Sequence, residues 1–179
     1  MIQNAFEHKI LRHILNTAGI TRFGGYQFDM VRLGIGLYGV ASAVEDRDAL
    51  KTVLTLKSAV TQIRELEAGE TVGYNRHGVL KRKSRIGTVP IGYADGLSRS
   101  LGNGVGRLWV NNQAAPIVGD ICMDMCMIDL TDIKAEEGET VIVFDENHKV
   151  DEIAKACGTI PYEILTRISR RVKRIYFQE

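Results

Sequence analysis

Short segments with alternating apolar and polar residues, separated by turn-forming sequences, dominate the chain from about residue 50 onward. Residues 53–66 form a long alternating run, and the turn signals Gly102-Asn-Gly104 and Asn111-Asn112 separate later segments. A period of two places one face of a strand against a core, and glycine or asparagine supplies the positive φ of tight turns. Many short strands with regularly spaced turns predict a mainly β domain, either a closed barrel or a sandwich.

The first forty residues follow a different pattern. Residues 10–15 predict a short buried strand, Asn16-Thr17-Ala18-Gly19 interrupts it, and residues 34–40 are almost wholly apolar. Fully apolar short strands are typical of parallel sheets that are buried on both faces. We therefore expect residues 1–40 to be part of a larger α/β domain, because they are too few for a complete one, and residues 41–179 to form the β domain.

The C-terminal region contains one predicted helix. Asp151 is its expected N-cap residue and Gly158 is expected to end it. Residues 164–177 are predicted to be extended, and the alternating charge of residues 167–174 is typical of a terminal strand with one exposed face.

Composition limits the classes of function. With 23 basic and 22 acidic residues, the chain has no overall field that would attract nucleic acid or an anionic membrane. No run approaches the roughly 18 apolar residues of a membrane span, and no signal-peptide pattern is present. Cys122, Cys126 and Cys157 are an odd set without Cys-x-x-Cys spacing, which predicts reduced thiols in a cytoplasmic protein. The histidines make no spaced pair with them, so we expect no metal site.

Residues 89–99, Val-Pro-Ile-Gly-Tyr-Ala-Asp-Gly-Leu-Ser-Arg, stand out within the β region. A β-branched strand ends in a turn between Gly92 and Gly96, and that turn holds Tyr93 and Asp95. Two interpretations stay open from these residues alone. Either Asp-Gly only shapes a hairpin whose tyrosine packs on the core, or the turn presents Tyr93 from a rigid scaffold, as functional loops do.

Seven motifs occur in a fixed order along the chain. They are His13-Ile-Leu-Asn-Thr-Ala-Gly19, Asp29-Met-Val-Arg-Leu-Gly-Ile-Gly-Leu-Tyr-Gly39, Gly73-Tyr74, Ile91-Gly-Tyr-Ala-Asp-Gly96, Ala115-Pro-Ile-Val-Gly119, Ile121-Cys-Met-Asp124 and Gly158-Thr-Ile-Pro-Tyr-Glu163. Together they resemble the C-terminal portion of the alanine racemase family, over about residues 13–177, and this resemblance favours the functional interpretation of the Tyr93 turn. These pyridoxal-phosphate enzymes consist of a (β/α)8 barrel followed by a mostly β domain. The resemblance implies that residues 1–40 are the last strands of the barrel and that residues 41–179 form an alanine racemase C-terminal-like β-barrel domain.

The resemblance implies roles for individual residues. Tyr93 matches the catalytic tyrosine, which exchanges the α-proton on one face of the substrate and serves the cofactor of the partner subunit. Arg32 matches the arginine that faces the pyridine nitrogen, and Met123 matches a residue whose backbone reaches the substrate carboxylate. The positions that match the phosphate-binding residues are Thr17, Gly34, Ile35 and Tyr162. The chain departs from the family at Asp120, where an arginine is common, and this change concerns the substrate channel.

No segment resembles the early barrel strand with the cofactor-binding lysine, so we expect the chain alone to be inactive. The expected parent is a cytoplasmic, homodimeric alanine racemase that interconverts L- and D-alanine by two-base proton transfer for peptidoglycan synthesis. The chain would be its C-terminal part, or that of a longer bifunctional cell-wall enzyme. Two alternatives stay open: a broad-specificity amino-acid racemase, and a non-catalytic β-barrel module whose role is dimerisation.

Overall fold

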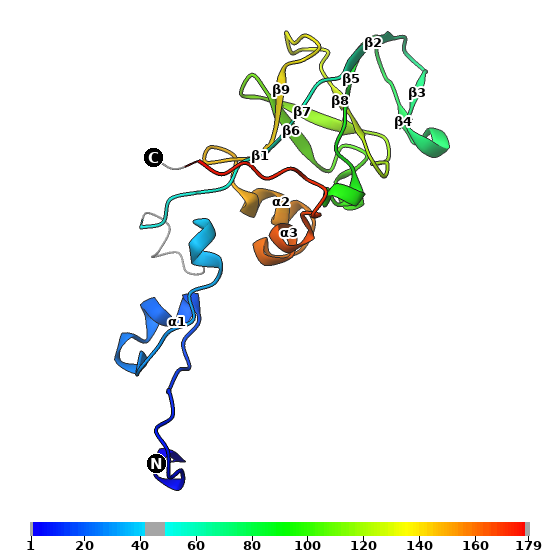
Figure 1. Cartoon of the computed structure of the whole chain (residues 1–179). Coiled ribbons are helices and arrows are strands. Elements are labelled where there is room, and N and C mark those ends of the chain that lie inside the picture. Colours follow the sequence, from blue (N-terminus) through cyan, green and yellow to red (C-terminus); the bar gives the residue numbers. More distant parts are fainter. Residues whose placement is uncertain (1, 42–48, 178–179) are drawn as a thin grey trace. The chain divides into compact units, whose positions relative to one another are not determined.

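The computed structural model describes residues 2–41 and 49–177. The chain divides into two compact units, Met1–Leu54 and Thr55–Glu179 (Figure 1). Each unit has its own secondary structure and is described separately below.

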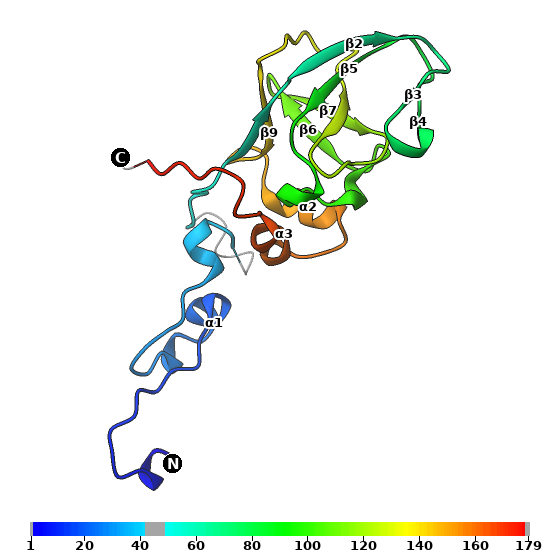
Figure 2. The same ribbon diagram turned by 45° about the vertical axis from the view of Figure 1, so that its right-hand side comes forward.

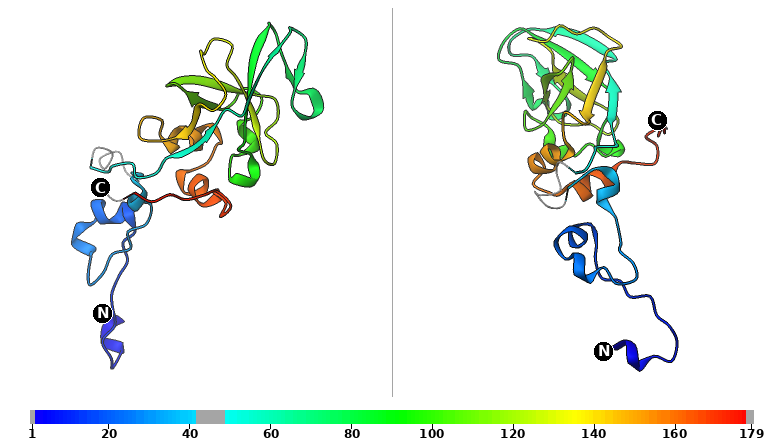
Figure 3. Two further views of the ribbon diagram at one scale, coloured as in Figure 1. Left: turned by 45° about the horizontal axis from the view of Figure 1, so that its top comes forward. Right: turned by 90° about the vertical axis from the view of Figure 1, so that its left-hand side faces the viewer.

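A single curled antiparallel sheet forms most of the second unit. Its strand order is β1-β9-β6-β7-β8-β5-β2, so the two end strands are adjacent in sequence. Only Val60 and Thr61 separate them, and the Val60 N–H donates to Glu139 O beside β9 while the Thr61 N–H donates to Thr88 O in β5. Because this bend passes from one end of the sheet to the other, the sheet curls back on itself (Figures 2 and 3). The strands are β1 (Leu56–Ala59), β2 (Gln62–Leu66), β5 (Ser84–Val89), β6 (Arg107–Val110), β7 (Gln113–Val118), β8 (Cys126–Asp129) and β9 (Thr140–Phe144).

The predicted mainly β, barrel-like architecture is confirmed, and so is the hairpin around Asn111-Asn112. These two residues have φ of 51° and 59° between β6 and β7, the left-handed geometry that matches strand twist in two-residue turns. The inward face of the sheet is apolar, and Leu108, Ile117 and Ile128 are fully buried. Burial of this alternating face is what favours the curled sheet over separate hairpins.

A small ribbon lies beside the main sheet. It pairs β3 (Thr71–Val72) with β4 (Gly78–Val79), and the 3-10 helix η5 (Tyr74–Arg76) connects them. Val72 and Leu80 form a buried cluster with Ile86 of β5, which attaches the ribbon to the sheet.

The C-terminal region differs from its prediction. Helices α2 (Val150–Ala156) and α3 (Pro161–Arg167) pack against each other near one end of the sheet (Figures 1 and 2). Asp151 is not the N-cap, which is Lys149, but lies in the first turn of α2, where a carboxylate still favours the helix N-terminus. Gly158 follows the C-cap with φ of 66°, as predicted.

The predicted extended conformation for residues 164–177 is wrong. Pro161 at the first turn has a φ suited to helix initiation, and an ion pair between Glu163 and Arg167 spans one turn, so α3 continues to residue 167. Residues 168–177 form no regular strand. The charge alternation there reflects arginines that bind separate partners, not a strand with one exposed face.

The first unit contains α1 (Thr17–Arg22) and the 3-10 helices η1 (Ile2–Ala5), η2 (Gly24–Tyr26) and η3 (Ile35–Tyr38). The expected strands at residues 10–15 and 34–40 are wrong, because the described residues of this unit form a single parallel bridge, between Asn16 and Arg32, and no strand. The N–H groups of Gly34 and Gly36 donate to the Thr17 hydroxyl oxygen, at 3.0 and 3.4 Å, in place of a neighbouring strand. A side-chain acceptor from 17 and 19 residues earlier in the chain has thus replaced the sheet ladder. Within the described ranges, every helix is too short to cross a lipid bilayer.

Candidate functional site

The turn that carries Tyr93 is held against the loop that carries Met123. Tyr93 begins the 3-10 helix η6 (Tyr93–Asp95), which a short connection joins to the end of strand β5. The Tyr93 N–H donates to Cys122 O and the Ala94 N–H to Met123 O, both at 3.0 Å. Tyr93 is 44% exposed and Met123 is 52% exposed, so neither side chain packs in the core of this unit. The structure therefore brings these two predicted site residues together on adjoining turns.

Glycine is required at both ends of this turn. A Cβ at Gly92 would lie 2.3 Å from Met123 O and 2.4 Å from Cys122 O. Gly96 has φ of 112°, and a Cβ there would lie 2.7 Å from Arg167 O. The Gly-Tyr-Ala-Asp-Gly sequence is thus a backbone packed closely against two other segments, which leaves Tyr93 little freedom to shift.

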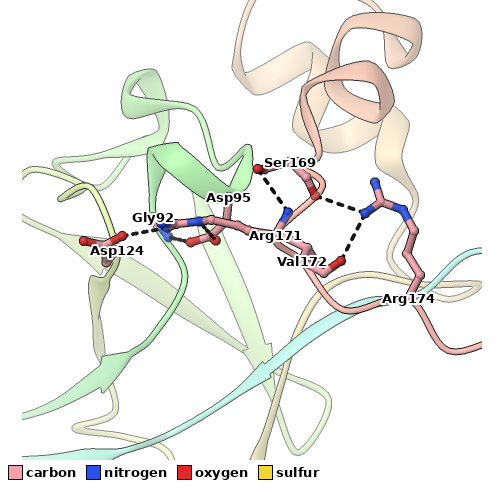
Figure 4. Close-up of polar contacts among 7 residues, drawn as sticks. All are labelled: Gly92, Asp95, Asp124, Ser169, Arg171, Val172 and Arg174. Carbon is pink, nitrogen blue, oxygen red and sulfur yellow. Dashed lines mark hydrogen bonds and ion pairs between the residues drawn. The ribbon is translucent and has the colours of Figure 1, made fainter.

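Arg171 joins this turn to the neighbouring loop (Figure 4). Its Nε donates to Asp95 Oδ1 and its Nη2 donates to Asp124 Oδ1, each at 2.7 Å. Asp95 Oδ2 in turn accepts the Gly92 N–H at 2.8 Å, and Asp95 O accepts the Ser169 N–H at 3.1 Å. Burial opposes ionisation of Asp95, but the hydrogen bonds from Arg171 and Gly92 outweigh it and place its pKa below the ordinary value.

A second polar cluster surrounds Asp120, just before the Met123 loop. The Asp120 carboxylate is buried and accepts a hydrogen bond from Asn103 Nδ2 at 2.8 Å. It also lies 3.0 Å from His77 Nδ1 and 3.8 Å from Arg99 Nη2. The hydrogen bonds from Asn103 and His77 lower the pKa of Asp120. Asp120 is therefore a buried carboxylate with its own basic and amide partners.

Thr17, Gly34 and Ile35 lie together in the first unit. The Thr17 hydroxyl oxygen accepts two N–H groups, so its lone pairs are used and its proton is left to donate. The Ile35 N–H begins η3 and has no acceptor within that helix. A hydroxyl proton and a backbone N–H at the start of a tight turn are the donors that a phosphate group requires, so these residues fit one.

Arg32 lies in the same unit, where it forms the parallel bridge with Asn16, the residue before Thr17, and its Nη2 donates to Ile14 O at 3.0 Å. Tyr162 is on α3 in the second unit and is 42% exposed. No group of three potential metal ligands occurs among the residues that the structure describes.

The sequence did not predict the polar contacts of Arg171, His77 and Asn103. It also did not predict that Asp95 accepts hydrogen bonds at this site. Arg171 lies 76 residues from Asp95 and 47 residues from Asp124, so no local pattern connects them. The sequence signal for Arg171 is the cluster of arginines near the C-terminus. Because these arginines alternate with apolar residues, the cluster looks like a strand.

Comparison with known proteins assigns the family. Residues 53–176 match the family described as "Alanine racemase, C-terminal domain", which is more than half of the chain. The chain belongs to the alanine racemase family. Residues 2–42 match a second alanine racemase family, described as "Alanine racemase, N-terminal domain".

Named alanine racemases are among its relatives. Alanine racemase 1 of Caldanaerobacter subterraneus subsp. tengcongensis is 42% identical over 176 residues, covering 94% of this chain and 45% of that protein. The alanine racemase of Helicobacter pylori strain J99 is 38% identical, covering 97% of this chain and 51% of that protein. The chain thus spans about half the length of these relatives.

Solved alanine racemase structures show the same fold. The Bartonella henselae enzyme, described with covalently bound pyridoxal phosphate, superposes with a TM-score of 0.88 at 36% identity, over 95% of this chain and 48% of that chain. The Bacillus anthracis enzyme, described with bound L-Ala-P, gives a TM-score of 0.84 at 38% identity, over 93% of this chain and 44% of that chain. The alanine racemase C-terminal domain is therefore the fold of the second unit.

Proposed function

We propose that the protein containing this chain is a pyridoxal-phosphate-dependent alanine racemase that interconverts L- and D-alanine, with Tyr93 as one of its two bases. The family assignment supports the reaction. The observation that carries the role of Tyr93 is its exposed phenol on a turn that is fixed by Cys122 and Met123. A rigid backbone that presents an accessible proton-transfer group suits a step that depends on orientation.

We further propose that residues 1–40 are the end of the cofactor-binding barrel and residues 41–179 the β domain. The matches of residues 2–42 and 53–176 to separate domain families support this division. The cofactor-binding lysine would lie outside this chain, so the chain alone would be inactive. Pyridoxal phosphate, when bound, withdraws electrons from the α-carbon of the amino acid and makes its proton removable.

The residues of this chain would then share binding and proton transfer. The Thr17 hydroxyl, the Ile35 N–H and the Tyr162 hydroxyl would donate to the phosphate. Gly34, which has no side chain, would let the backbone come close to it. Arg32 would face the ring nitrogen, and a guanidinium there does not release its proton, so the nitrogen would stay unprotonated. The backbone at Met123 would bind the substrate carboxylate, while Tyr93 Oη would accept or return the α-proton on one face.

A tyrosine hydroxyl has an ordinary pKa near 10, so Tyr93 needs a cationic or hydrogen-bonding environment to accept a proton near neutral pH. We propose that this environment belongs to the active site of a second subunit. Tyr93 would thus serve the cofactor of its partner in a homodimer, and each site would combine residues from both chains.

The Tyr93→Phe variant of the full-length protein tests the proposal. We expect racemisation of alanine to fall by about 100-fold or more, because the proton acceptor on one face is lost. The absorbance of bound cofactor should be retained, since the phenyl ring occupies the same place. Tyr26→Phe is the matched control, as Tyr26 is an exposed tyrosine outside the proposed site. Unchanged activity of Tyr93→Phe would refute the role, and rates with alanine, serine and lysine would distinguish a broad-specificity racemase.

A further inference from the structure

We propose that Arg171 is a positioning residue, which fixes the Tyr93 turn relative to the Met123 loop through Asp95 and Asp124. This inference rests on the proposed function, because it concerns the distance between the proposed base and the proposed carboxylate-binding backbone. Neither the motifs nor the resemblance assigns a role to Arg171, whose segment was predicted to be a strand.

The two turns are connected at two places. At one, the backbone hydrogen bonds from Tyr93 to Cys122 and from Ala94 to Met123 join them directly. At the other, the guanidinium of Arg171 connects the side chains of Asp95 and Asp124 (Figure 4). Without Arg171, the turns would keep the two backbone bonds and the close packing at Gly92, but Asp124 would lose its connection to Asp95. A small rotation about the remaining bonds would then change the distance between Tyr93 and Met123.

The geometry specifies arginine. Nε and Nη2 lie on one planar group and donate to two different carboxylates at 2.7 Å each, an arrangement that a single ammonium cannot reproduce in the same directions. Asp95 is the anchored end, because its side chain is only 14% exposed and its second oxygen holds the Gly92 N–H. Asp124, 56% exposed, is the movable end. The exposed ion pair between Arg171 and Asp124 adds little to the free energy of unfolding. Its main effect is therefore on the relative position of the two turns.

The segment that carries Arg171 is itself braced. Arg174 donates from Nη1 to the carbonyls of Ser169 and Val172 at 3.1 and 3.0 Å (Figure 4). The Ser169 N–H donates to Asp95 O at 3.1 Å. The loop is thus folded independently of the Arg171 side chain. Replacing that side chain should release the turns without unfolding the loop.

Loss of Arg171 also changes the local charge. Asp95 and Asp124 would then face each other without a cation, and Asp124 adjoins Met123. An uncompensated carboxylate beside the backbone that is proposed to bind the substrate carboxylate would repel that substrate. Two separate effects follow: displacement of Tyr93 should lower kcat, and the charge of Asp124 should raise KM.

The test uses the full-length protein with Arg171→Gln, Arg171→Lys and the matched control Arg170→Gln. Arg170 is the neighbouring arginine; it is exposed, and no ion pair of its side chain occurs in the described part of the chain. We expect Arg171→Gln to lower kcat for alanine by about tenfold and to raise KM a few-fold. Arg171→Lys should recover KM, because the charge is restored, but not kcat. Adding Asp124→Asn to Arg171→Gln should likewise recover KM alone.

Hydrogen exchange of the same full-length variants supplies a readout that does not depend on activity. Peptides that cover residues 92–96 and 122–124 should exchange faster in Arg171→Gln and at the original rate in Arg170→Gln. Normal kcat, or a lowered kcat with unchanged exchange in both peptides, would overturn the positioning role. If the unmodified full-length protein does not racemise alanine, the proposed function fails, and faster exchange of both peptides would still show that Arg171 holds the turns together.

Discussion

At the scale of single residues, Gly92 shows how closely the Tyr93 turn packs against the Met123 loop. Its φ lies in the ordinary extended region, so the backbone conformation alone does not require glycine. The requirement comes from the carbonyl oxygens of Cys122 and Met123, which occupy the position that a Cβ would take. The sequence pattern predicted a turn at this glycine, but the reason for the glycine lies 30 residues further along the chain.

Gly92→Ala is therefore expected to destabilise the second unit by about 1–3 kcal/mol, the usual cost of overpacking. Gly138→Ala is the informative comparison, because Gly138 has φ of 93° but open space around it, so only backbone strain of about 1 kcal/mol applies. Urea denaturation followed by circular dichroism measures both. An equal or smaller loss for Gly92→Ala would contradict the close contact with the Met123 loop.

Secondary-structure elements were predictable where the signal was local. The β6–β7 hairpin follows from two asparagines between alternating segments, and the end of α2 follows from Gly158. The strand predictions for the residues of η3 and α3 were wrong for two different reasons. For α3, Pro161 and the Glu163–Arg167 pair are local helix signals, and the alternating residues that follow obscured them. For η3, the reason is not local. Thr17 supplies an acceptor to Gly34 and Gly36 from another part of the chain, and the apolar run then forms a turn instead of a strand.

At the same scale, Asp120 connects the β3–β4 ribbon to the loop after β7, and its pKa is lowered by Asn103 and His77. A carboxyl group with a pKa lowered on folding contributes stability above its unfolded pKa, and this contribution is lost as the pH falls through the folded pKa. We therefore expect the free energy of unfolding to decrease below about pH 4.

Asp120→Asn should lower the urea midpoint at pH 7, and the difference from the unmodified protein should shrink as the pH falls below that range. Glu146→Gln is the control, since Glu146 is exposed and has no side-chain hydrogen bond or ion pair within the described residues. A difference for Asp120→Asn that stays constant from pH 7 to pH 3 would show that the Asp120 charge does not contribute.

At the scale of the whole molecule, the curled sheet of the second unit shields its inner face from solvent. Cys126 in β8 is fully buried, and burial raises the pKa of its thiol to about 12. Cys122 and Cys157 are only partly buried. Since the thiolate is the reactive form, the three cysteines should differ strongly in reactivity.

Alkylation with iodoacetamide at pH 8 should therefore modify Cys157 fastest in the native protein. Cys122 should react more slowly, because burial and the nearby Asp120 charge raise the pKa of its thiol, and Cys126 should react at the rate of global unfolding. Mass spectrometry of peptic fragments assigns each site. Cys157→Ser should remove the fastest-reacting thiol and leave the reaction of Cys126 unchanged. Rapid modification of Cys126 under native conditions would show that the curled sheet opens locally.

The sequence by itself determined the mainly β character of residues from about 50 onward, its turns and the family to which it belongs. The strands and turns depend on alternation and on turn residues within a few positions of each other. The family follows from the resemblance of motifs that occur in one order along the chain. Only the tertiary structure showed that Arg171 joins the Tyr93 turn to Asp124 and that Asp120 gathers His77 and Asn103. The physical reason is that a hydrogen bond depends on distance in space, and the partners of Arg171 lie 76 and 47 residues away along the chain.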